Sequence, residues 1–258
     1  MSNRVRSLIN IALFCAMVFL NYLANALPLN GVTQKQISAD YQIYLTPAGY
    51  VFAIWGIIYL GLLAFVITQA LPRYLNDRRL RTLDLPFVSS CLCNMTWLTV
   101  WHYRYVPLSV VVMLGLLGSL MWAYVRLDKQ RQSDTQPVWF VERTFSVYLG
   151  WVCLATMLNI AVLLYTMGWN GGPLSPQTWT VILLAVAVGL FAYLGLSRRD
   201  PSILGVLLWA SIGIGIKNQG DTMIVTACFV VVLACLAVAY RLFVLQRKMA
   251  SFAQSTAS

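Results

Sequence analysis

A single stretch, residues 46–71, constrains the fold more than any other part of the chain. Its sequence is TPAGYVFAIWGIIYLGLLAFVITQAL, which contains no charged residue. An α-helix rises about 1.5 Å per residue, so about 20 apolar residues cross the hydrocarbon layer of a bilayer. The stretch therefore predicts a membrane-spanning helix, with Thr46 as its N-cap and Pro47 in its first turn.

The composition of the whole chain is that of a membrane protein. Of its 258 residues, 60% are hydrophobic and only 10% are charged, whereas soluble domains carry roughly 25% charged residues. The net charge of +10 could suggest a nucleic-acid partner, but the basic residues lie in short loops between apolar runs, as the positive-inside rule requires. We therefore expect contact with a lipid bilayer and no nucleic-acid partner.

The apolar runs predict an all-α, polytopic membrane bundle of about eight transmembrane helices. Glycines in the seventh run, Gly205, Gly213 and Gly215, are expected at close helix contacts. That run is short, so a re-entrant segment is the alternative to a full span. The predicted spans are residues 8–27, 46–71, 83–101, 106–127, 144–167, 178–196, 202–216 and 223–245.

The charges in the loops favour eight spans over seven. With eight spans, all of the 18 basic residues except Lys35, Arg104 and Lys217 fall on one side of the membrane. With seven, the basic residues after the last run would lie on the opposite side. We therefore expect a multi-pass protein of the inner or plasma membrane, with both termini cytoplasmic and with residues 28–45 and 168–177 external.

The first run, residues 8–27, has a second interpretation. A basic start, an apolar middle and an A-x-A pattern at residues 24–26 are typical of a signal peptide. Against its removal, Asn10, Asn21 and Asn25 share one helical face, as expected where a span packs polar side chains against neighbouring helices. Both interpretations stay open at this point.

The sequence contains no pattern typical of a catalytic or metal-binding site. The six cysteines lie in apolar segments, and Cys91 and Cys93 point to nearly opposite helix faces, which argues against a shared metal. His102 is the single histidine, and we expect it in a short loop, solvated or at the membrane interface. The acidic residues lie in loops or at span ends, whereas a proton-coupled carrier usually keeps an ionisable group at mid-membrane. We expect no metal, and the sequence does not favour an enzyme.

Three predicted helices carry aromatic and amide side chains at helical spacing. Faces of this kind that converge make a flat-walled, mostly apolar pocket, which would suit a planar conjugated ligand. The alternative is plain packing, because Trp and Tyr also populate membrane interfaces and Asn also joins helices. The residues on these faces are Phe52, Trp55, Tyr59, Asn94, Trp97, Trp101, Tyr148, Trp151, Ala155 and Asn159.

Segments of these same helices resemble one protein family. The segments PAGYVFAIWGIIYL, CNMTWLTVW and VYLGWVCLATMLNIAVLL are similar to the translocator protein family, also called tryptophan-rich sensory proteins (TspO/MBR) or the peripheral benzodiazepine receptor family. The resemblance covers residues 8–170. It divides the chain into a five-helix ligand-binding bundle, residues 1–170, and an additional three-helix membrane segment, residues 171–258. The chain departs from the family at residues 46–49, where the usual double proline is TPAG, and in its three extra helices.

The resemblance implies a ligand pocket inside the five-helix bundle, with residues 28–45 as its lid. Family members bind porphyrins and other hydrophobic ligands, and transport, sensing and porphyrin breakdown have each been proposed as their activity. We therefore expect a sensor or carrier for a tetrapyrrole-like ligand such as a porphyrin or haem, with no required cofactor and with a homodimer or membrane complex as its assembly. The alternatives are a permease or a membrane subunit of a larger complex, and a porphyrin-degrading enzyme. The pocket residues that the resemblance implies are Trp55, Tyr59, Asn94, Trp97, Trp151, Ala155 and Asn159.

Overall fold

The computed structural model describes residues 2–27, 29–32, 36–37, 40–131, 139–169 and 171–255. Every regular element within these ranges is helical. In chain order they are α1 (Asn3–Ala26), η1 (Leu29–Gly31), η2 (Gly49–Ala53), α3 (Ile54–Ala70), α4 (Arg78–Arg81), α5 (Asp84–His102), α6 (Val106–Arg131), α7 (Trp139–Thr166), α8 (Pro176–Arg198), α9 (Pro201–Lys217) and α10 (Thr222–Ser255).

The helices confirm a polytopic membrane bundle. Six of them are long and apolar enough to cross a bilayer: α1, η2 together with α3, α6, α7, α8 and α10. Helix α9 is apolar but has only 17 residues. Helix α5 has 19 residues and carries more polar side chains. Each of the eight predicted apolar runs thus corresponds to a helix.

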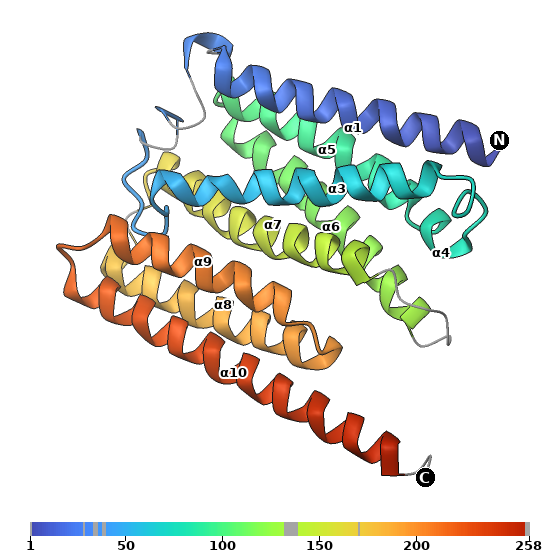
Figure 1. Cartoon of the computed structure of the whole chain (residues 1–258). Helices are drawn as coiled ribbons and strands as arrows, with labels where there is room; N and C mark the ends of the chain where they lie inside the picture. Colours follow the sequence, from blue (N-terminus) through green and yellow to red (C-terminus); the bar gives the residue numbers. More distant parts are fainter. Residues whose placement is uncertain are drawn as a thin grey trace.

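Helix α7 occupies the centre of the molecule, packing against α3, α6 and α9. Together α1, α3, α5, α6 and α7 form one bundle, and α8, α9 and α10 form a layer on one side of it (Figure 1). We call these the bundle and the layer. Helix α9 joins the two, because it contacts both α7 and η2 of the bundle as well as α8 and α10.

Both chain termini lie at the same end of the molecule, where the short helix α4 also lies (Figure 1). An even number of crossings requires this arrangement, so it agrees with eight spans. Which side of the membrane this end faces stays a prediction from the loop charges.

Helix α1 packs into the bundle through its amides. Asn10 Nδ2 donates to Gln69 Oε1 at 3.0 Å, and Asn21 Nδ2 donates to Asn94 Oδ1 at 2.9 Å. Asn10 and Asn21 are both buried, which confirms the packing interpretation for these two residues. Asn25 is exposed and donates to the main-chain oxygen of Asn21 instead.

The predicted start of the second span is wrong. Thr46 and Pro47 precede the helix, and Ala48 is the N-cap of η2, which continues into α3. The backbone N–H of Ala48 donates to the main-chain oxygen of Gly213 in α9 at 3.0 Å. A tertiary contact therefore takes the place of the first helical turn that the Thr-Pro signal predicted.

The prediction for His102 is also wrong, because this residue is fully buried as the last residue of α5. Its Nδ1 lies 2.8 Å from the main-chain oxygen of Leu98. The chain reverses one residue later than expected, at residues 103–105, with Arg104 in the left-handed region at φ 60°. Helix ends are uncertain by one or two residues in any sequence-based assignment.

A buried carboxylate ties the layer to the bundle. Asp200 caps α9 by accepting from the backbone N–H of Ser202 at 2.9 Å. The same side chain accepts from Arg143 Nη1 of α7 at 2.5 Å and from the hydroxyl of Ser146. One residue at the start of α9 therefore fixes this end of the layer on the central helix.

Candidate ligand-binding site

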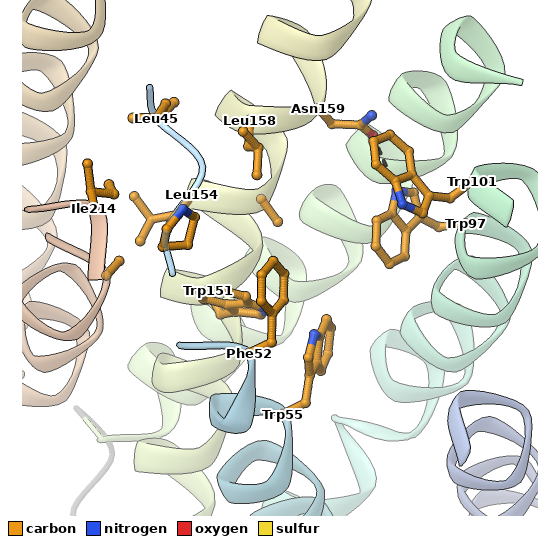
Figure 2. A pocket seen from close by; sticks show the side chains of 13 residues that line it. Leu45, Phe52, Trp55, Trp97, Trp101, Trp151, Leu154, Leu158, Asn159 and Ile214 are labelled. Atoms are coloured by element: carbon orange, nitrogen blue, oxygen red, sulfur yellow. Dashed lines mark hydrogen bonds between the residues drawn. The ribbon is translucent and has the colours of Figure 1, made fainter. Parts of the chain in front are cut away.

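A mostly apolar cavity lies between α3, α5, α7 and α9, next to the segment that leads into η2 (Figure 2). Its volume, the space open to the centre of a water molecule, is about 60 Å³. It is lined by Leu45, Pro47, Phe52, Trp55, Trp97, Trp101, Trp151, Leu154, Ala155, Leu158, Asn159, Ala210 and Ile214.

Most of the predicted site residues meet in this cavity wall. Three of them, Tyr59, Asn94 and Tyr148, do not line it. Tyr59 stacks on Trp55, with ring centroids 5.5 Å apart. Asn94 donates to the hydroxyl of Tyr148 at 3.2 Å and accepts from α1, so these two residues join helices. The predicted residues that do line the cavity are Phe52, Trp55, Trp97, Trp101, Trp151, Ala155 and Asn159.

The aromatic side chains form two walls. Trp97 and Trp101 of α5 stack with centroids 6.0 Å apart and an interplanar angle of 19°. Across from them, Phe52 and Trp55 meet the ring of Trp151 edge-on, at 5.7 Å and 6.3 Å (Figure 2). Stacked and edge-on contacts between rings at such distances lower the free energy. These contacts therefore hold the rings of each wall in place.

The polar atoms of the two walls differ in their hydrogen bonding. On the α5 side, Asn159 Oδ1 accepts from Trp97 Nε1 at 3.2 Å, and Asn159 Nδ2 donates to Ser109 Oγ at 2.9 Å. Asn159 therefore bridges three helices. On the other side, the indole Nε1 of Trp151 is buried and has no hydrogen-bond partner among the described residues.

A second, larger cavity adjoins the first, is open to the surface beside the exposed side chains of Tyr22 and Asn25, and has a volume of about 430 Å³. It lies between α1 and α3, and both Phe52 and Trp55 line it as well as the first cavity. These two side chains are therefore the partition between the cavities. The remaining lining residues are Val18, Asn21, Tyr22, Asn25 and Tyr59.

The segment that includes residues 40–53, here called the lid segment, covers one end of the aromatic walls. Its Tyr41 packs against Trp101 at 5.9 Å and against Tyr165 at 6.1 Å between ring centroids. Burial raises the pKa of the Tyr41 hydroxyl, while nearby Arg104 acts in the opposite direction. Arg104 also forms an ion pair with Asp40 at 2.6 Å. Of the lid expected at residues 28–45, residues 28, 33–35 and 38–39 lie outside the described residues.

Sequence reasoning missed the aliphatic and proline part of the wall. Ala210 and Ile214 belong to α9, so the cavity is not formed by the first five helices alone. Small and aliphatic residues of this kind occur throughout every apolar run, so the sequence does not distinguish those that line the cavity from those that do not. The other residues that were missed are Leu45, Pro47, Leu154 and Leu158.

The described residues contain no group of three or more His, Cys, Asp or Glu side chains that could hold a metal ion. Cys91 is buried and Cys93 is half-buried, both as free thiols. The chemistry available at the cavity is therefore aromatic stacking, apolar contact and hydrogen bonding from an indole or an amide.

Comparison with known families gives one match. The sequence model of the family described as "TSPO-like protein" matches residues 7–241. No curated protein sequence and no solved structure matches the chain. The match continues beyond residue 170, where the motif resemblance ended, and includes α8, α9 and most of α10. This chain, an integral membrane protein, therefore belongs to the TSPO-like protein family.

Proposed function

We propose that the protein binds a flat, hydrophobic, tetrapyrrole-like ligand between the two aromatic walls and acts as a sensor or carrier for it. Trp97 and Trp101 on one side and Trp151 on the other offer ring faces and edges to such a ligand. Aromatic contacts of this kind are worth about 0.5–1.5 kcal/mol each beyond the burial of area.

The observation that carries the proposal is the buried indole N–H of Trp151, which has no acceptor among the described residues. Leaving a buried donor unpaired costs about 1–3 kcal/mol. A ligand that places a carbonyl, carboxylate or ring nitrogen beside this N–H would remove that cost. The ligand class is therefore flat and apolar, with a hydrogen-bond acceptor on the side that meets α7.

The cavity is smaller than the ligand we propose. Ligand pockets are typically about 300–1,000 Å³, whereas this cavity measures about 60 Å³. Displacing Phe52 and Trp55 would join it to the adjoining cavity of about 430 Å³, which brings the combined space into the usual range. We therefore expect binding to move these two side chains.

The residues that line the cavity include no ionisable side chain. A carrier coupled to protons needs a group that exchanges them at mid-membrane. None of the described residues that line the cavity supplies such a group.

The test is a titration of the purified protein with protoporphyrin IX, followed by quenching of tryptophan fluorescence. Trp151→Phe keeps an aromatic ring against Phe52 but removes the N–H group. It should weaken binding about three- to tenfold, the equivalent of one lost hydrogen bond. Trp122→Phe, on an exposed tryptophan of α6 outside the cavity, is the matched control and should bind as the wild type does. Equal affinities for the two variants would contradict the proposal.

The absorbance of the bound porphyrin, recorded in light and in the dark, separates binding from breakdown. A spectrum that persists supports a sensor or carrier. A loss of absorbance in the wild type that Trp151→Phe abolishes would assign the protein to the enzyme alternative instead.

A further inference from the structure

We infer that α9 is a latch that holds the lid segment, residues 40–53, over the cavity, and that release of this latch opens the cavity. The consequence for ligand access rests on the proposed function, whereas the latch itself does not. In this role the layer acts on the cavity, although the motifs of the sequence placed the cavity in the first five helices alone.

Main-chain groups of the lid segment bond directly to α9. The backbone N–H of Ala48 donates to the main-chain oxygen of Gly213 at 3.0 Å. The indole Nε1 of Trp209 donates to the main-chain oxygen of Val51 at 3.0 Å. The ring of Trp209 also packs edge-on against Tyr50, with centroids 5.3 Å apart. Helix α9 thus accepts from the N-cap N–H of Ala48, which has no partner within its own helix.

A second pair of hydrogen bonds holds Tyr44 of the lid segment, at the C-terminal end of α9 and the N-terminal end of α8. Asn218, the C-cap of α9, donates from Nδ2 to the main-chain oxygen of Tyr44 at 3.0 Å. Gln177 of α8 donates from Nε2 to the hydroxyl of Tyr44 at 3.0 Å. Two helices of the layer therefore hold one residue of the lid segment.

The close approach of α9 to the lid segment depends on a glycine. A Cβ atom at Gly213 would lie 2.1 Å from Val51 Cγ2 and 3.3 Å from Pro47 Cβ. Since real Cβ atoms do not come so close to another atom, any larger residue at Gly213 would push the lid segment away from α9. Gly205 of the same helix has no atom within 4 Å of its Cβ position, so the expected close contact is absent there.

Helix α9 has free space on both of its faces. Ala210 and Ile214 line the aromatic cavity, while Ser211 and Gly215 line a groove of about 410 Å³ shared with α10. Dense packing resists displacement, and at these two places α9 has space into which it can move. A shift of α9 towards α10 would break its bonds to Ala48, Val51 and Tyr44 and so release the lid segment.

The experiment measures exposure of the lid segment without any ligand. Leu45 is buried and lines the cavity, so Leu45→Cys should react slowly with a water-soluble maleimide. The unsubstituted chain, with its native cysteines, is the blank. Adding Gly213→Ala should speed labelling about tenfold, and adding the matched control Gly205→Ala should leave it unchanged. Adding Val51→Ala to the Gly213→Ala chain removes the clashing methyl group and should return the rate to within about twofold of the starting one.

Equal labelling of the Gly213→Ala and Gly205→Ala chains would overturn the inference, and so would failure of Val51→Ala to restore slow labelling. If Gly213→Ala does not fold, Trp209→Phe replaces it, because that change keeps a ring beside Tyr50 and removes only the bond to Val51. It should speed labelling about threefold, and an unchanged rate would contradict the latch. Porphyrin plays no part in this measurement, so a failed porphyrin titration would leave its outcome unaffected.

Discussion

The bundle and the layer are held together by different chemistry. In the bundle, buried polar side chains bond across helices: Asn21 of α1 to Asn94 of α5, and Asn94 to Tyr148 of α7. In the layer, apolar and small residues make the contacts between helices, as where Gly215 of α9 approaches Cys228 of α10.

Several polar side chains of the layer form hydrogen bonds to the lid segment or to α7. Gln177, Trp209 and Asn218 donate to the lid segment, and Asp200 accepts from α7. Buried side-chain hydrogen bonds thus join the helices of the bundle to one another, whereas several polar side chains of the layer bond to the lid segment and to α7. The latch inferred above depends on this difference, because the bonds from the layer reach the lid segment.

The largest expected effect is the presence or absence of cysteine labelling, which shows whether α9 crosses the membrane. Gly220, in the turn between α9 and α10, has open space around its Cβ position, and Asn76 lies in the exposed turn before α4. In intact cells, Gly220→Cys should react with an impermeant maleimide and Asn76→Cys should not. Reaction at Asn76→Cys alone would reverse the predicted orientation, and reaction at neither position would show that α9 does not span.

Next in size is the effect of removing the tie between layer and bundle. Asp200→Ala deletes a helix cap and leaves Arg143 without its carboxylate, so unfolding in detergent should become easier by about 3 kcal/mol. Asp221→Ala is the matched control, since Asp221 accepts from the backbone N–H of Ile224 at the start of α10 and should cost about 1 kcal/mol. If the two variants lose equal stability, the contact with α7 contributes nothing.

Asn159→Leu should have a smaller effect, on stability rather than on binding. It removes the acceptor of Trp97 Nε1, while Ser109 keeps its bond to the main-chain oxygen of Val106, and this should cost about 1–2 kcal/mol of unfolding free energy. Porphyrin affinity of the folded protein should stay within about twofold. Gln246→Leu, on an exposed amide of α10 that lines neither cavity, is the control. A loss of affinity without a loss of stability would mean that this amide addresses the ligand.

The smallest expected effect is a pH dependence in the α4 turn of the bundle. Hydrogen bonding from the side chain of Arg79 lowers the pKa of Asp77 below its usual value. Because this pKa is lower in the folded state, the ionised carboxylate stabilises the fold above about pH 4, and the contribution is lost as the pH falls through the folded pKa. Asp77→Asn should therefore cost under about 1 kcal/mol at pH 7. The difference from the wild type, measured by thermal unfolding, should vanish in acid, and a difference that persists there would have another cause.

Helical spacing predicted which residues share a helix face, but it could not predict which of them reach the cavity. A period of 3.6 residues places Trp55 and Tyr59, or Tyr148 and Trp151, on one face of a helix. Which member of each pair reaches the cavity depends on the crossing of neighbouring helices, so Tyr59 and Tyr148 were assigned to the wall along with Trp55 and Trp151.

The remaining errors arise where distant parts of the chain meet. Thr46 and Pro47 form a sound local helix start, yet the bond from Ala48 to α9 displaced that start. Ala210 and Ile214 have no local signal, because their role depends only on where α9 lies. The eight helices were predictable, since length and apolar composition alone limit what can cross a bilayer.

The most direct test of the central claim, that the aromatic cavity holds the ligand, is to fill it. Ala155 lines the cavity and Ala161, on the same helix and likewise half-buried, does not. Native mass spectrometry of the purified protein with protoporphyrin IX should show the complex for the wild type and for Ala161→Phe, and no complex for Ala155→Phe, whose ring would occupy the space between the walls. A complex of undiminished abundance with Ala155→Phe would place the ligand outside the aromatic cavity.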